Sequence, residues 1–148
     1  MIVSIASDHA GFEQKQQLVE FLKDEGYQVV DQGPQSDDRV DYPDFAVLVG
    51  KDVSSGRVDR GVLVCGTGVG MALAADKIAG VRAANIINKQ FAELCRQHNN
   101  ANVITLSGRF VSLDENKEIL RTFLTTEFEG GRHADRVAKI DALDKSDS

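Results

Sequence analysis

Cys65 ends an apolar run and leads directly into a glycine-rich segment, Cys65-Gly66-Thr67-Gly68-Val69-Gly70. Glycines let backbone N–H groups converge on an anion, and the beginning of the helix expected after them adds positive potential. The same field favours the thiolate form of a cysteine, which is its reactive form. The segment therefore predicts a small anion-binding loop, suited to a phosphate or an oxyanion, beside a reactive thiol.

Two other interpretations of this segment are weaker. A nucleotide-binding loop would read G-x-G-x-x-G after the first strand, whereas here G-x-G-x-G follows the third expected strand, and no acidic residue ends the next one at Ile86-Ile87-Asn88. No Lys-Ser or Lys-Thr pair follows, as a Walker loop requires. A small core residue is the other alternative for Cys65, but its place at the functional end of a strand favours chemistry. Cys95 lies on an apolar helix face, where core packing is expected.

Two histidine pairs lie at the ends of expected elements, where polar groups can face a cleft. Asp8-His9 follows the first strand, and His98-Asn99 follows the fourth helical stretch after Asn88. Each histidine alone is more typical of a structural role. Together with Cys65 they supply an acid and a base, the minimum for moving a proton between adjacent carbons. The three histidines show no paired spacing such as H-x-x-x-H, so neither a metal nor another cofactor is expected.

Cationic side chains suited to a phosphate group cluster near the C-terminus. Arg132 and Arg136 lie four residues apart at the opening of the last helix, a geometry that fits a phosphate dianion. A solvated basic turn paired with nearby carboxylates is the alternative. Arg109, just after the fifth strand, is a third candidate, and Tyr42 is placed to line the same cleft.

Short apolar runs alternate with amphipathic stretches along the whole chain. A parallel α/β sheet covered on both faces is predicted, with ligands at the carboxyl ends of its strands. We expect Leu48 and Phe91 on buried helix faces and His98 turned inward. One domain is expected over residues 1–143, followed by a disordered tail at 144–148. The expected strands are 2–6, 27–30, 61–65, 81–86 and 102–106, and the expected helices are 12–25, 43–55, 70–78, 88–98, 112–128 and 134–143.

Composition excludes several classes of partner. A formal net charge of −6 over 148 residues disfavours a nucleic acid, whose backbone needs a broad basic face. No apolar run approaches the roughly 18 residues of a membrane helix, and no secretion leader is recognised, so a cytoplasmic protein is expected. The two cysteines are then expected to be free thiols.

Read in order, seven segments resemble the type B ribose-5-phosphate isomerase family. The resemblance covers residues 1 to about 143. It implies a Rossmann-like three-layer α/β/α sandwich with a five-stranded parallel sheet. It also implies a homodimer or a dimer of dimers with shared active sites, and cofactor-free interconversion of ribose 5-phosphate and ribulose 5-phosphate. The segments are Ser7–Phe12, Asp41–Pro43, Cys65–Gly70, Ala74–Lys77, His98–Asn99, Ala101–Val103 and Glu129–His133.

The same resemblance implies a role for each candidate residue. Cys65 is the base that carries a proton between carbons 1 and 2, while His98 opens the sugar ring, helped by Asp8 and Thr67. The enediolate is stabilised by the loop Gly66, Gly68, Val69 and Gly70, and the sugar is bound by Asn99. Tyr42 stays a substrate-binding candidate from its place beside the cleft. The phosphate grip consists of His9, Arg109, Arg132 and Arg136.

Alternatives remain within and outside this activity. Val69 stands where one subgroup has a glutamate base, so the chain is of the cysteine type. Galactose-6-phosphate isomerase subunits lack the His98-Asn99 pair and the segment 130–133, which favours a five-carbon substrate. Asp76, Asn100 and residues 85–89 depart from the family pattern and leave isomerisation of allose 6-phosphate or galactose 6-phosphate open. A non-catalytic module that binds phosphosugars or nucleotides is the other alternative, although it would not need the thiol.

Overall fold

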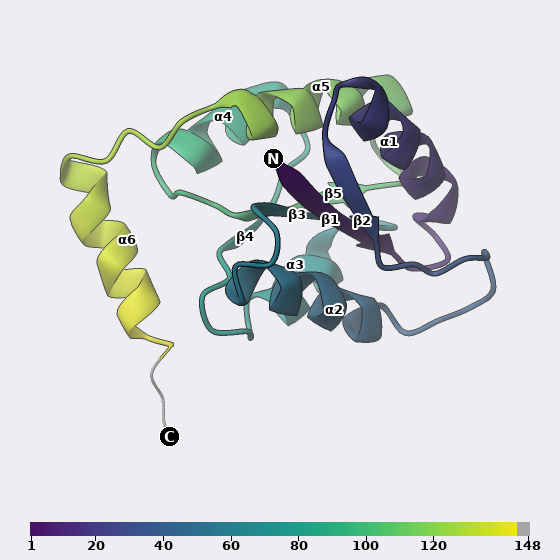
Figure 1. Ribbon diagram of the computed structural model, residues 1–148, viewed down its shortest axis with the longest axis horizontal. Helices are drawn as coiled ribbons and strands as arrows, with labels where there is room; N and C mark the ends of the chain where they lie inside the picture. The colour runs from purple at the N-terminus through teal and green to yellow at the C-terminus, as the bar shows by residue number, and fades with distance from the viewer. Residues whose placement is uncertain (145–148) are drawn as a thin grey trace.

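The computed structural model describes residues 1–144 and contains one five-stranded sheet in the order β2-β1-β3-β5-β4, with every neighbouring pair parallel. Helices α1, α4 and α5 cover one face of the sheet, and α2 and α3 cover the other (Figure 1). This confirms the predicted three-layer α/β/α architecture. The strands are β1 (Ile2–Ser7), β2 (Gln28–Asp31), β3 (Arg60–Cys65), β4 (Ala83–Asn85) and β5 (Val103–Ser107). The helices are α1 (Phe12–Asp24), α2 (Tyr42–Ser54), α3 (Val69–Ala75), α4 (Lys89–Gln97), α5 (Leu113–Thr125) and α6 (Arg132–Ala142).

Strand β3 separates two hydrophobic cores because successive side chains of a strand point to opposite faces. Val62 and Val64 pack under α1, α4 and α5, whereas Leu63 and Cys65 pack under α2 and α3. Within residues 1–144, no helix is both long and apolar enough to span a membrane.

Two helix faces differ from their prediction. Both Phe91 and Leu48 were expected in the core, but Phe91 is 56% exposed and Leu48 is 40% exposed. In α4 the inward face is formed by Ala92, Cys95 and Arg96, which rotates the helix so that Phe91 faces outward. In α2 the small residue Gly50 faces inward, where an added Cβ would collide with Ile78, so the close approach turns Leu48 outward.

Several boundaries also differ from prediction. Helix α3 ends at Ala75 rather than near residue 78, β4 is limited to Ala83–Asn85, α5 ends at Thr125, and α6 begins at Arg132. At the first residue of the expected tail, the Asp144 carboxylate accepts a hydrogen bond from the Gly80 N–H at 2.8 Å, so this residue is held in place. The rest of that expected tail, residues 145–148, lies outside the described residues.

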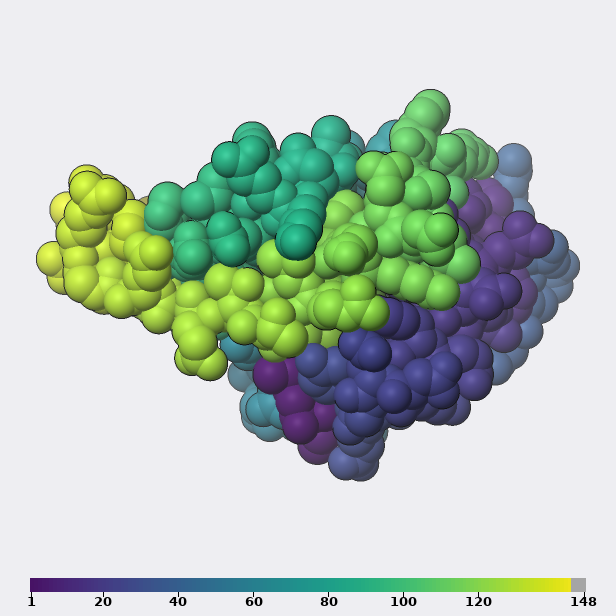
Figure 2. Space-filling view, turned by 90° about the horizontal axis from the view of Figure 1, so that it is seen from above, coloured from purple at the N-terminus to yellow at the C-terminus, as the bar shows by residue number. Residues whose placement is uncertain are grey.

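Helix α6 projects from one end of the molecule (Figures 1 and 2). Val137 is its only buried residue, and Ile140 is 47% exposed. An ion pair between Arg82 and Asp141 at 3.0 Å links α6 to the amino end of β4. The helix that carries both candidate phosphate-binding arginines therefore lies outside the two cores.

Candidate active site

The carboxyl ends of β1, β3 and β5 place three predicted site residues side by side. Asp8 follows β1, Cys65 ends β3, and Arg109 lies two residues beyond β5. The Asp8 N–H donates to the Val64 carbonyl at 3.1 Å, and the Gly108 N–H donates to the Cys65 carbonyl at 2.8 Å. The strand ladders thus continue past the strand ends and fix these residues at one edge of the sheet.

The Cys65 thiol is held by the loop that follows it. The Gly68 N–H points at Cys65 Sγ, with 3.1 Å between nitrogen and sulfur, and Cys65 is only 5% exposed. Gly68 has a positive φ of 88°, and a side chain there would collide with Asn85. Its carbonyl accepts a hydrogen bond from the Thr105 hydroxyl at 2.7 Å. Glycine is therefore required for the turn that aims a backbone donor at the sulfur.

Three further predicted residues surround this loop. The Tyr42 ring lies against Gly70, so closely that any side chain there would overlap it. The Arg109 guanidinium covers Gly66, where an added Cβ would lie 3.3 Å from one of its nitrogens. The exposed Thr67 hydroxyl accepts from the Val69 N–H at 3.1 Å. The loop therefore combines a thiol, backbone donors, a hydroxyl and a cation in one place.

Asp8 and His9 form the neighbouring part of the same edge. The Asp8 carboxylate accepts from the Gly11 N–H at 3.0 Å, which fixes its orientation at the beginning of α1. His9 Nδ1 accepts from the Val40 N–H at 3.4 Å. In the neutral imidazole this bond assigns the proton to Nε2, which leaves an N–H donor available for an anion. We call Asp8, His9, Tyr42, Cys65, the loop 66–70 and Arg109 the thiol cluster.

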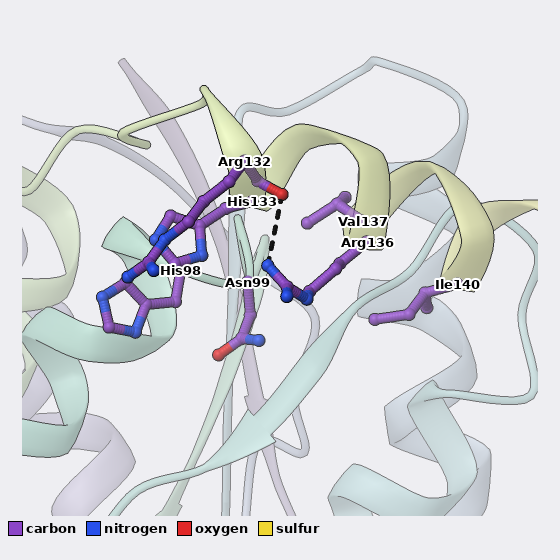
Figure 3. Close-up of a pocket in the computed structure, with 7 residues that line it drawn as sticks. All are labelled: His98, Asn99, Arg132, His133, Arg136, Val137 and Ile140. Carbon is purple, nitrogen blue, oxygen red and sulfur yellow. Dashed lines mark hydrogen bonds between the residues drawn. The ribbon is translucent and has the colours of Figure 1, made fainter.

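A second group of predicted residues lines a separate pocket of about 380 Å³ beside α6 (Figure 3). His98 lies at the C-terminal end of α4, and its N–H donates to the Leu94 carbonyl at 2.9 Å. Arg136 donates to the Arg132 carbonyl at 3.4 Å. The pocket, which we call the α6 cluster, is lined by His98, Asn99, Arg132, His133, Arg136, Val137 and Ile140.

His98 does not point into the core, contrary to its predicted orientation. Its imidazole stacks on that of His133, with ring centroids 4.3 Å apart and an interplanar angle of 16°. Burial is the largest cause that lowers the pKa of His133. The nearby His98 and Arg132 lower this pKa further, while Glu129 raises it. These surroundings therefore favour the neutral form of the His133 imidazole more than water does.

The thiol cluster and the α6 cluster lie at opposite edges of the sheet. His98 precedes β5, whereas Cys65 pairs with Ser107 at the far end of β5. Asn99 lines a second pocket with Arg82 and Ala83, at the amino end of β4. Four residue steps of β5 alone separate the edges by about 13 Å. Within the described part of one chain, Cys65 and His98 therefore do not line the same cleft.

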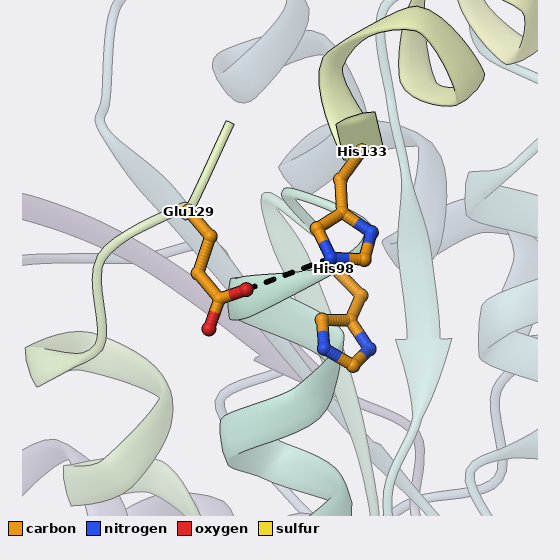
Figure 4. A group of neighbouring side chains, drawn as sticks. All are labelled: His98, Glu129 and His133. Atoms are coloured by element: carbon orange, nitrogen blue, oxygen red, sulfur yellow. Dashed lines mark ion pairs between the residues drawn. The ribbon is translucent and has the colours of Figure 1, made fainter. Parts of the chain in front are cut away.

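Sequence reasoning missed several contacts in both clusters. Asn85, which lies against Gly68, could have been signalled only by its place at a strand end. No metal was expected, because the histidines are far apart in the sequence. The stacking of His98 on His133 shows that two of them nevertheless lie side by side, so this reason no longer holds. One nitrogen of each ring and a Glu129 carboxylate oxygen lie within 4.8 Å of one another (Figure 4).

Comparison with known proteins agrees with this geometry. Residues 3–140 match the family model for Ribose/Galactose Isomerase. Ribose-5-phosphate isomerase B of Escherichia coli K12 is 42% identical over 143 residues, which cover 97% of this chain and 96% of that protein. The structure of Clostridium thermocellum ribose-5-phosphate isomerase B has a TM-score of 0.95 at 46% identity, with 97% of each chain covered.

A further solved structure is that of ribose-5-phosphate isomerase B from Mycoplasma genitalium with bound ribulose-5-phosphate. It has a TM-score of 0.95 and 47% identity, and the match covers 99% of this chain and 97% of that one. The similarity thus extends over both clusters and through α6. On these matches, the chain belongs to the ribose/galactose isomerase family.

Proposed function

We propose that this chain interconverts D-ribose 5-phosphate and D-ribulose 5-phosphate through an enediolate. The observation that carries the proposal is the Gly68 N–H aimed at Cys65 Sγ at 3.1 Å, at the carboxyl edge of a parallel sheet. A thiolate held at this position can remove a proton from one carbon and return it to its neighbour. The relatives named ribose-5-phosphate isomerase B, one of them with bound ribulose-5-phosphate, support the choice of substrate.

The proposed proton transfer develops negative charge on the oxygens of carbons 1 and 2. The glycine-rich loop beside Cys65 offers backbone N–H groups to meet this charge, and that of Gly68 already points at the Cys65 sulfur. Comparable donors in oxyanion sites contribute roughly 2.7–4 kcal/mol each to the transition state. The Thr67 hydroxyl and the Asp8 carboxylate flank the same space, so they are the proposed helpers of the acid–base steps.

Ring opening is assigned in this proposal to His98, with Asn99 binding the sugar. Because His98 and Cys65 lie at opposite edges of one sheet, both can reach one sugar only if two copies of the chain contribute to each site. One copy supplies its thiol cluster and the other its α6 cluster. A two-fold symmetric homodimer then forms two equivalent sites. A dimer of dimers would preserve them.

The phosphate group is proposed to bind between the same two clusters. His9 Nε2 and the Arg109 guanidinium are available at the thiol cluster, and Arg132 and Arg136 are exposed on α6. Charge-assisted hydrogen bonds from arginine to phosphate are the strong class of such bonds, often made in pairs. Both cationic groups would therefore hold the end of the sugar remote from the reacting carbons.

The setting of the enzyme completes the proposal. Residues 1–143 act as one catalytic domain in a reducing cytoplasm, where Cys65 and Cys95 stay as the free cysteines they are in this structure. The reaction itself needs no metal or other cofactor, because acid, base and anion-binding groups are all supplied by side chains and backbone.

A direct assay tests the proposed activity. Purified protein treated with EDTA is expected to convert ribose 5-phosphate to ribulose 5-phosphate. The conversion is measured by the appearance of the ketose. Preferred turnover of allose 6-phosphate or galactose 6-phosphate would move the assignment to a six-carbon substrate. Phosphosugar binding without turnover of any of the three would indicate a binding module instead.

A further inference from the structure

Three metal-ligating side chains meet beside the α6 pocket, although they come from separate segments. His98 follows α4, Glu129 lies in the connection between α5 and α6, and His133 is in the first turn of α6. His133 Nε2 lies 3.5 Å from Glu129 Oε1, and one nitrogen of His98 completes a group within 4.8 Å (Figure 4). Two imidazoles and one carboxylate are a ligand set typical of zinc sites with an open position.

The backbone holds this arrangement together in the protein alone. The Glu129 N–H donates to the Gln97 carbonyl at 3.1 Å, which joins the connection to the end of α4. The His133 N–H donates to the Gly130 carbonyl at 3.0 Å. Arg96, only 3% exposed, donates to the carbonyls of Thr126 at 3.1 Å and Ala101 at 2.6 Å. The segments that carry the three ligands are thus already joined.

Protonation and charge at the site are compatible with a cation. Zinc binds imidazole in its neutral form, so neither ring carries an extra proton when the ion is bound. The groups facing the rings are the Glu129 carboxylate, which attracts a cation, and the Arg132 and Arg136 guanidinium groups, which oppose it. The attraction of two nitrogen ligands and one carboxylate oxygen for the ion must exceed its repulsion by these two exposed guanidinium groups.

We propose that His98, Glu129 and His133 bind one Zn²⁺ ion and that this ion inhibits the enzyme reversibly. Zinc takes imidazole nitrogens at about 2.0–2.1 Å, so the two stacked rings must rotate until their lone pairs converge on the ion. The fourth position faces the pocket and is taken by water. Inhibition rests on the proposed function, because a metal bound to the His98 imidazole blocks the side chain that opens the ring. The binding site itself does not depend on that function.

Binding is tested by isothermal titration calorimetry with zinc chloride on EDTA-treated, then desalted protein at pH 7.5. We expect one zinc per chain. Glu129→Gln and His133→Asn should each weaken the affinity at least tenfold, in line with the sensitivity of metal sites to their ligand shells. Glu127→Gln, which changes a neighbouring exposed carboxylate, and Cys65→Ser should bind as the parent does. Equal zinc affinity in all variants, or loss of binding only in Cys65→Ser, would overturn the site.

Inhibition is measured on the same proteins with ribose 5-phosphate. Zinc at ten times its dissociation constant should lower the parent rate about elevenfold, and excess EDTA should restore it. Glu129→Gln should keep the parent rate without zinc and need at least ten times more zinc for half inhibition. Zinc bound at the site without inhibition would contradict the role of His98 in ring opening and the inhibitory part of this proposal. Turnover with no zinc binding would overturn the metal site and leave the isomerase assignment intact.

Discussion

The thiol cluster and the α6 cluster are built in contrasting ways. Cys65 is buried at a strand end, and its carbonyl and thiol both accept backbone hydrogen bonds. Arg132 and Arg136 are exposed on a helix whose only buried residue is Val137. The first cluster is fixed by the core of its own chain, whereas the second is an outlying surface.

This difference assigns distinct tasks to the two regions. Proton transfer requires a base held within a fraction of an ångström of the reacting carbon, which the strand end provides. In the proposed function, ring opening by His98 and phosphate binding by Arg132 and Arg136 would use this outlying surface, presented by a second copy of the chain. Changes at Cys65 should therefore lower the rate of proton transfer, and changes in the α6 cluster should alter ring opening, phosphate binding or assembly.

The largest effect is expected from Cys65→Ala. Loss of a general base should lower kcat by about 10²–10⁴-fold, while phosphosugar binding persists because the cationic groups remain. Exchange of the carbon-2 proton with solvent should stop, as measured by NMR in D₂O. Cys95→Ala is the matched control, since burial raises the pKa of this core thiol to about 11 and it faces neither cluster. Near-normal exchange in Cys65→Ala would make Asp8 the next candidate base.

Subunit mixing probes whether the two clusters meet across an interface. Cys65→Ala and His98→Asn proteins should each be nearly inactive on cyclic ribose 5-phosphate, but His98→Asn should act better on open-chain sugar. After complete exchange in a dimer, one site in each mixed pair is intact, so activity should return to about a quarter of the parent value. Activity that fails to return despite exchange proven by native mass spectrometry would place both residues in a site within one chain.

A smaller effect is expected at the phosphate-binding surface. Arg136→Ala removes charge-assisted bonds, so KM for ribose 5-phosphate and the inhibition constant of inorganic phosphate should both rise about tenfold with little change in kcat. Lys139→Ala is the control, because it removes one positive charge from the same exposed helix. Equal inhibition of parent and Arg136→Ala by phosphate would show that the arginine does not contact it.

Local patterns sufficed to place Cys65 and its loop, whereas they named His98, Asn99, Arg132 and Arg136 without predicting that these residues line one separate pocket. Strand β3 and its glycine loop are continuous in sequence, so the position of Cys65 followed from an apolar run and the glycines after it. Strand order and the separation of the two sheet edges depend on contacts between distant segments, which one sequence does not display. The stacking of His98 on His133 likewise depends on where α6 lies. The prediction that Phe91 is buried was wrong because periodicity marks an apolar helix face without distinguishing the core from an exposed surface.

The smallest effect concerns how firmly α6 is held. Asp141→Asn breaks the ion pair with Arg82. The Arg82 side chain is 18% exposed and that of Asp141 is 44% exposed, so the free energy of unfolding should fall by at most about 1 kcal/mol. Amide exchange in α6 should nevertheless accelerate, because few other contacts hold this helix, while exchange in β3 stays unchanged. KM should rise about twofold, with the carbon-2 exchange rate of bound sugar unaltered. Equal acceleration of exchange in α6 and β3 would mean that the two regions open together, and the contrast between a fixed thiol cluster and a movable α6 cluster would then be wrong.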